Sequence, residues 1–201
     1  MEYNDFTLES AEATLGVMTH TGDLFPGIQP ALVPTWLDQL LQRSRGLALM
    51  NGKARSEFLV APILLAVREA SGDSVAILSG QRLDIDSGRH LHGECDFLLT
   101  SSAPVPRVRA PIVAVVESMR NDIDGGLGKC VAQMVAAQMY NERAGQPRPT
   151  IYGSVTTGEN WQFLGLTGTA VVLHRPRLYL AEVGLILAAF GRAVGGVTVP
   201  A

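Results

Sequence analysis

The segment Pro111-Ile112-Val113-Ala114-Val115-Val116-Glu117-Ser118-Met119 is the most informative stretch of this sequence for its fold. Residues 111–116 are apolar on both faces of an extended chain, a pattern typical of a strand that is covered on both sides. Such a strand lies in the middle of a sheet that carries helices on either face. The segment therefore predicts a central strand that ends in an acidic residue, Glu117.

Helices and strands are predicted on both sides of this strand. Helical periodicity indicates helices over 34–43, 56–70, 127–143 and 181–194, and strand patterns occupy 74–79, 81–86, 94–100, 150–156, 161–167 and 170–174. A helix, a strand meander and then a strand–helix–strand crossover predict an α/β fold with a mixed central sheet flanked by helices. Gly and Pro residues interrupt residues 1–33, which indicates a loosely organised N-terminal arm.

Length and composition favour one domain. The chain has 201 residues, of which 47% are hydrophobic and 17% charged, so it can bury a large core. We expect a single domain, 1–201, with an N-terminal arm and helix in 1–50, a core in 51–167, and a C-terminal strand and helix in 168–201.

The charge is small and unevenly distributed. A formal net charge of −3 argues against a protein that coats nucleic acid through its overall field. Residues 1–100 carry 13 Asp and Glu against 7 Lys and Arg, whereas residues 101–201 carry 6 against 9, which permits a local basic surface in the second half. Only two of these cations are lysines, Lys53 and Lys129.

The two cysteines, Cys95 and Cys130, form no CxxC pair, which favours reduced, buried thiols. The acidic N-terminus lacks the basic and apolar regions of a signal peptide, and no apolar run reaches the length of a membrane span. We expect a cytoplasmic protein that does not enter membranes. Its low charge and apolar C-terminal helix predict self-association into a homo-oligomer.

Two acids at strand ends, Asp96 and Glu117, are the strongest chemical signal. A carboxylate at the end of a buried strand needs a cation or a donor, because leaving it unpaired costs several kcal/mol. A divalent cation between the two acids would satisfy both. Pairing of Glu117 with Arg109 or Arg120 is the structural alternative.

Two other motifs fail. The segment 125–130 follows a strand and opens a helix, but Ile123 and Cys130 stand where a P-loop needs Gly and Ser or Thr. We interpret its glycines as a flexible start to the helix. The acids at 122 and 124 resemble the start of a calcium loop, but Gln133 occupies the position of the loop's final Glu.

Segments 56–64, 93–99, 115–119, 126–134 and 151–158 together resemble the PD-(D/E)XK phosphodiesterase superfamily, the restriction-endonuclease-like nucleases. Within it, the chain looks most like a group of small bacterial proteins. The resemblance covers roughly half of the chain and implies a restriction-endonuclease-like core of a helix, three strands, a helix and a strand.

The resemblance also implies a metal-dependent nuclease. In such enzymes, the positions of Asp96, Glu117 and the Ser118 carbonyl hold Mg²⁺ or Mn²⁺, and the acid of the first helix falls on Glu57. The metal polarises the phosphate and lowers the pKa of the attacking water. We therefore expect Glu57, Asp96, Glu117 and Lys129 to be catalytic, and nucleic acid to be the partner.

Met119 occupies the position where the family carries its lysine, and a thioether supplies neither charge nor hydrogen-bond donor. Two explanations remain open. The lysine function has moved to Lys129 on the following helix, or the site has lost catalysis and serves as a binding or assembly module.

Two geometric expectations follow. Asp96 and Glu117 should lie on adjacent strands, with Cys95 and Phe97 facing the other side of the sheet. Binding of nucleic acid should involve cations of the second half, namely Arg107, Arg109, Arg120, Lys129, Arg143 and Arg148.

Overall fold

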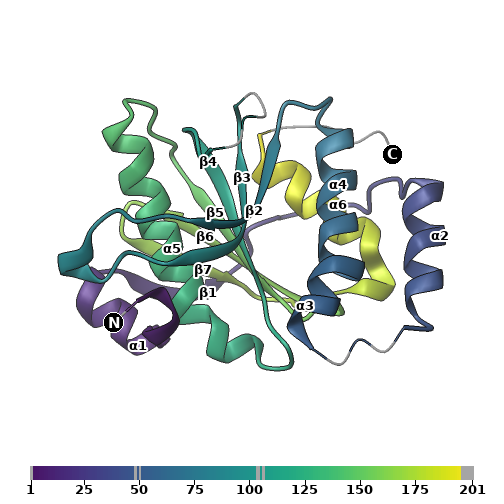
Figure 1. Ribbon diagram of the computed structural model, residues 1–201, viewed down its shortest axis with the longest axis horizontal. Helices are drawn as coiled ribbons and strands as arrows, with labels where there is room; N and C mark the ends of the chain where they lie inside the picture. Colours follow the sequence, from purple (N-terminus) through teal and green to yellow (C-terminus); the bar gives the residue numbers. More distant parts are fainter. Residues whose placement is uncertain (1, 48, 50, 103–104, 106, 196–201) are drawn as a thin grey trace.

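The computed structural model describes residues 2–47, 49, 51–102, 105 and 107–195. An eight-stranded mixed sheet lies between two helical layers, in the order β1-β7-β6-β5-β4-β3-β2 with β8 paired to β6 (Figure 1). The predicted α/β class with a mixed, helix-flanked sheet is confirmed. The last residues of the predicted C-terminal part, 196–201, lie outside the described residues.

The strands are short and closely follow the predicted ones after residue 93. They are β1 (Met18–Gly22), β2 (Ala76–Arg82), β3 (Glu94–Thr100), β4 (Ile112–Ser118), β5 (Ile151–Thr156), β6 (Asn160–Thr167), β7 (Ala170–His174) and β8 (Leu178–Tyr179). The longer helices are α1 (Leu8–Leu15), α2 (Thr35–Ser44), α4 (Ala61–Ala70), α5 (Ile123–Arg143) and α6 (Val183–Ala193). Short helical segments are η1 (Tyr3–Asp5), α3 (Gly52–Arg55), η2 (Ser56–Val60), η3 (Ser87–Arg89) and η4 (Leu180–Glu182).

Strand β4 is central, as its apolar run predicts. It pairs antiparallel with β3 and parallel with β5, and its residues 112–117 are all buried. The parallel β4–β5 pair is connected through α5, which packs back on both strands. This crossover places the first turns of α5 beside the last residues of β4.

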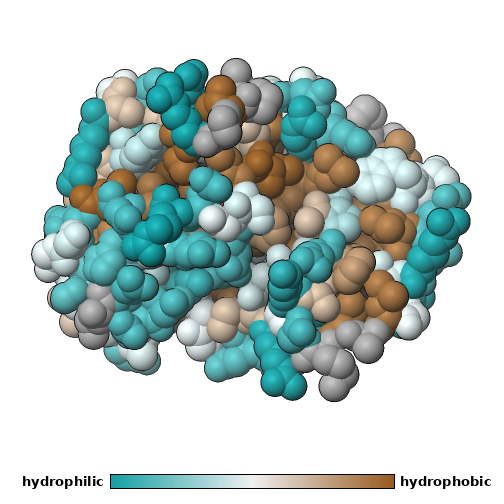
Figure 2. All heavy atoms as spheres, viewed as in Figure 1, coloured by the Kyte–Doolittle hydropathy of each residue, from teal (hydrophilic) through white to brown (hydrophobic). Residues whose placement is uncertain are grey.

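Each face of the sheet has its own hydrophobic core. One core packs α1 and α5 against the sheet around residues such as Leu98, Val115 and Val131. The other packs α2, α4 and α6 around residues such as Ile63 and Phe190. Among the described residues, no helix combines the length and the hydrophobicity that crossing a membrane requires. Hydrophobic side chains reach the surface between α2 and α4 (Figure 2).

The helix predicted over 56–70 begins earlier, because Asn51 accepts a hydrogen bond from the Ala54 N–H and caps α3. The helix then continues through the π-helical turns of η2 into α4. Pro62 lacks the N–H that an α-helix would direct at the carbonyl of residue 58. The wider π-helical turn before Pro62 accommodates this missing bond without ending the helix.

The prediction of a loosely organised N-terminal arm is wrong. Residues 1–33 contain η1, α1 and β1, and β1 extends the sheet by pairing in parallel with β7. A Cβ on Gly128 of α5 would stand 2.4 Å from the Phe6 carbonyl oxygen and 2.3 Å from the Thr7 carbonyl carbon. Glycine at 128 thus lets the arm cross α5 in direct backbone contact.

The interpretation of the Gly-rich segment as a flexible start to the helix is also corrected. Residues 125–130 lie within α5, and a Cβ on Gly126 would be 2.7 Å from Val155 Cγ1 and 3.0 Å from Met119 Cγ. Gly126 thus permits close packing of the helix on the sheet.

The region 74–86 forms one strand, β2, instead of the two predicted. Gly80 lies within this strand with a φ of 61°, which bends the chain opposite Asp96. The side-chain alternation of β3 is broken there. Phe97 packs in the α4–α6 core, but Cys95 packs in the α5 core, so the expectation that both residues face one side is wrong for Cys95.

Candidate functional site

The candidate site lies where β4 ends, between the first turns of α5 and segment α3–η2 (Figure 1). Two local interactions fix its position. The Asp122 carboxylate accepts a hydrogen bond from the Gly125 N–H at 2.9 Å and caps α5. On the other side, Gly52 of α3 packs directly on the end of β4, where its Cβ would be 3.6 Å from the Ser118 carbonyl oxygen.

Glu117 is fully buried at the centre of the site. Its Oε2 forms an ion pair with Lys129 Nζ at 2.6 Å, and its Oε1 accepts a hydrogen bond from Gln133 Nε2 at 2.6 Å. The cation beside Glu117 is therefore Lys129, and neither Arg109 nor Arg120. Burial, together with repulsion from Asp96, raises the pKa of Glu117 to about 7, although Lys129 and Gln133 partly offset this effect.

Asp96 lies beside Glu117 on the adjacent strand β3, as predicted. Asp96 Oδ2 accepts a hydrogen bond from the Ser118 N–H at 2.7 Å, while the Asp96 N–H points at Glu117 Oε1 from 3.4 Å. Unlike Glu117, Asp96 is partly exposed. The two acids are therefore neighbours, but Glu117 is buried and Asp96 reaches the surface.

Lys129 reaches Glu117 from the second turn of α5, with 16% of its side chain exposed. Burial acts to lower the pKa of Lys129, but the charge and hydrogen bond of Glu117 raise it above its usual value, so the ammonium stays charged. Met119 instead packs against Gly126 of α5. Residue 119 therefore makes an apolar contact, and the cation beside Glu117 comes from α5.

A polar groove opens over Asp96. It is lined by Gly52, Lys53, Ser56, Glu57, Ser79, Gly80, Glu94, Asp96 and Ser118. Glu57 lies on this groove, where its carboxylate is 3.8 Å from Lys53 Nζ. The structure thus brings Glu57 to the same groove as Asp96, whereas Glu117 and Lys129 are not among the described residues that line it.

The donor set suits a hard divalent cation in its chemistry. Carboxylate oxygens are the ligands that Mg²⁺ prefers, and Mg²⁺ needs only one or two of them because it keeps several waters. The groove and the buried pair carry Glu57, Glu94, Asp96 and Glu117 against Lys53 and Lys129, an excess of acid that a cation would offset. Within the described residues, no three His, Cys, Asp or Glu side chains group together as a metal site.

The six cations expected to contact nucleic acid lie at two ends of the sheet. Lys129 and the exposed Arg120 lie at the candidate site. Arg107 and Arg109 precede β4, and Arg143 follows Asn141, whose amide bonds the Ile112 N–H and carbonyl at the start of β4. The ends of β4 are about 20 Å apart. Arg148 precedes β5 and shares the distant end with the others.

Sequence reasoning assigned no role to two residues that the structure brings to this site. Gln133 lies four residues after Lys129 and so shares its helix face. This spacing was a signal that Gln133 also contacts Glu117. For Lys53, the signal was the scarcity of lysine, since both lysines of the chain are at this site.

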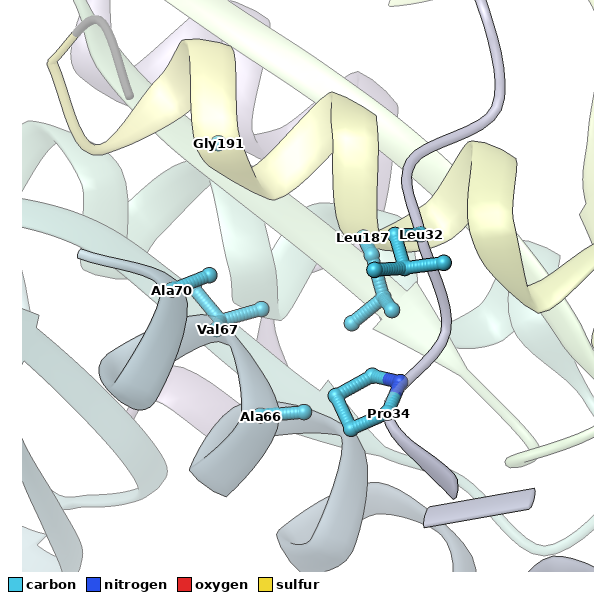
Figure 3. Close-up of a pocket in the computed structure, with 7 residues that line it drawn as sticks. All are labelled: Leu32, Pro34, Ala66, Val67, Ala70, Leu187 and Gly191. Atoms are coloured by element: carbon cyan, nitrogen blue, oxygen red, sulfur yellow. The ribbon is translucent and has the colours of Figure 1, made fainter. Parts of the chain in front are cut away.

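A second cavity lies between α4, α6 and residues 32–34 (Figure 3). Its volume is about 20 Å³, and its lining is made of Leu32, Pro34, Ala66, Val67, Ala70, Leu187 and Gly191. None of the described residues that line it has an ionisable side chain.

Comparison with known protein families and with curated proteins finds no match to this chain.

Proposed function

We propose that this protein is a divalent-metal-dependent phosphodiesterase acting on nucleic acid, with a restriction-endonuclease-like core and its lysine supplied by α5. The observation that carries this proposal is the ion pair of Lys129 Nζ with Glu117 Oε2 at 2.6 Å, next to Asp96, which lines a polar groove. The resemblance of the sequence to PD-(D/E)XK enzymes supports it.

In this proposal Asp96, Glu117 and the Ser118 carbonyl hold Mg²⁺ or Mn²⁺. The bound ion would polarise the phosphate and make an attacking hydroxide available at neutral pH. Lys129 stabilises the negative charge that develops on the phosphate oxygens. Gln133 keeps the Glu117 carboxylate oriented, and Glu57 acts from the groove as the additional acid.

The test is cleavage of DNA and RNA with Mn²⁺ or Mg²⁺ by the wild type and by single variants. Removal of one preorganised charge-stabilising group lowers a rate about 10²–10³-fold. Lys129→Ala should therefore abolish a slow activity as completely as Asp96→Ala. Met119→Lys should add little, because Lys129 already supplies the charge.

Arg43→Ala is the matched control, since it removes an exposed cation on α2 that does not line the groove. It should retain cleavage. A metal-dependent activity that survives Lys129→Ala in a folded variant would refute the role of Lys129.

A second function has one specific observation in its favour. Glu117 Oε2 forms an ion pair with Lys129 and Oε1 accepts a hydrogen bond from Gln133, so both oxygens lie against protein groups. This closed arrangement favours a catalytically degenerate binding or assembly module. In that case the wild type should be inactive, Mn²⁺ should not raise the melting temperature, and Met119→Lys alone should restore cleavage.

A further inference from the structure

Lys53 and Lys129, the two lysines of this chain, border the candidate site in contrasting ways. The Lys129 side chain is 16% exposed and paired with Glu117, whereas the Lys53 side chain is 84% exposed and lines the groove. Because Lys129 Nζ is paired with the Glu117 carboxylate, Lys129 can contact only a ligand group that lies next to Glu117. Lys53 is free to meet a group that lies along the groove.

The backbone holds Lys53 in a defined place. The preceding Gly52 packs on the end of β4, with its Cβ position 3.6 Å from the Ser118 carbonyl oxygen and 3.7 Å from the Arg120 nitrogen. Asn51 caps the helical turn through a hydrogen bond from the Ala54 N–H at 2.8 Å. The long side chain therefore extends from a backbone position that these two contacts define, beside the site.

The interaction that Lys53 makes with Glu57 is weak. Lys53 Nζ and Glu57 Oε1 are 3.8 Å apart, and both side chains are mostly exposed. Exposed pairs of this kind contribute little stability. The ammonium can therefore transfer to a stronger anion, and a phosphate offers several charge-assisted hydrogen bonds.

The groove needs such a cation if a polyanion is to follow it. Three carboxylates line it, Glu57, Glu94 and Asp96, and these repel phosphates. The lining also contains the hydroxyls of Ser56 and Ser79, which can donate to phosphate oxygens. Lys53 is the one cation in the described lining of this groove.

We infer that Lys53 binds a phosphate next to the scissile one, so the site takes a nucleic-acid strand with at least two phosphates and not an isolated phosphodiester. This inference rests on the proposed function. Lys53 is a substrate-positioning residue, and Lys129 serves the reacting phosphate.

The first experiment compares Lys53→Met with wild type on two substrates in the presence of Mn²⁺. A short DNA oligonucleotide carries flanking phosphates, and bis(p-nitrophenyl) phosphate carries none. Lys53→Met should raise KM for the oligonucleotide about tenfold, the effect of one hydrogen bond to a charged group, with little change in kcat. It should leave the kinetics with bis(p-nitrophenyl) phosphate unchanged, and Lys53→Arg should restore the oligonucleotide KM.

The second experiment measures binding of the same labelled oligonucleotide by fluorescence anisotropy over a series of salt concentrations, in an Asp96→Asn background. Loss of one phosphate contact should reduce the slope of log K against log salt by about 0.7–0.9. Arg43→Met, which removes an exposed cation on α2 outside the groove, is the matched control and should leave the slope unchanged.

An unchanged salt slope in Lys53→Met, no binding of the oligonucleotide, or an equal loss with both substrates would each overturn the inference. If the wild type hydrolyses neither substrate, the proposed function fails. The binding series then still decides whether Lys53 contacts phosphate.

Discussion

The buried carboxyl of Glu117 should make the stability of this protein depend on pH in an unusual direction. Its pKa is raised from 4.5 to about 7 in the folded chain. Between these two values the folded state therefore binds more protons than the unfolded state. The free energy of unfolding must then fall as the pH rises through this window.

The size of the effect follows from the shift in pKa. A shift from 4.5 to about 7 corresponds to about 3 kcal/mol, at about 1.4 kcal/mol per pH unit. This contribution is fully present below pH 4.5 and is lost above pH 7. Lys129, with its pKa above the usual value, stays protonated throughout this range and adds no slope of its own.

The assay is urea unfolding followed by tryptophan fluorescence at several pH values between 4 and 8, with EDTA present. Glu117→Gln removes the titrating group and should remove the corresponding fall in unfolding free energy, seen as a difference from wild type that changes with pH. Glu94→Gln is the control, because Glu94 is an exposed carboxyl at the start of β3. Parallel pH profiles of wild type and Glu117→Gln would refute the reasoning.

Three further changes test the interactions around the site and the sheet. Lys129→Met leaves the Glu117 carboxyl buried without its cation, so it should cost about 3–5 kcal/mol of unfolding free energy at pH 8 and less at pH 5, where the carboxyl is protonated. Addition of Glu117→Gln should recover much of this loss, and equal losses at both pH values would contradict the ion-pair explanation. Asn141→Ala removes both hydrogen bonds to the Ile112 backbone, which should lower the unfolding free energy, measured with urea, by about 2–4 kcal/mol. A loss of unfolding free energy below about 0.5 kcal/mol would show that water replaces the amide. Gly128→Ala forces the Phe6–Thr7 backbone away from α5, so amide hydrogen exchange in α1 should accelerate. The control Gly46→Ala, whose Cβ would meet its nearest atom at 3.7 Å, should leave exchange in α1 unchanged. Protection of α1 equal to wild type in Gly128→Ala would refute the contact.

Local patterns in the sequence were sufficient for the elements that bury a periodic face. The apolar run 111–116 predicts the central strand because a strand buried on both sides needs no alternation, and β3 was predicted with its observed bounds. The pairing of the acids Asp96 and Glu117 on neighbouring strands also followed from such patterns. The nuclease-like function itself stays a prediction.

The tertiary structure decided the contacts between segments that are far apart in the chain. The parallel pairing of β1 with β7 joins residues such as Met18 and Ala170, and no local periodicity encodes such a register. The role of Gly128 in α5 also depends on a distant contact. Only the crossing of the N-terminal arm over Gly128 shows that this glycine allows close packing and is not a flexible position. Likewise, Lys53 and Lys129 come to one site because segment α3 and helix α5 both pack on the end of β4, from opposite sides. The burial and the charge pairing at this site depend on three-dimensional proximity.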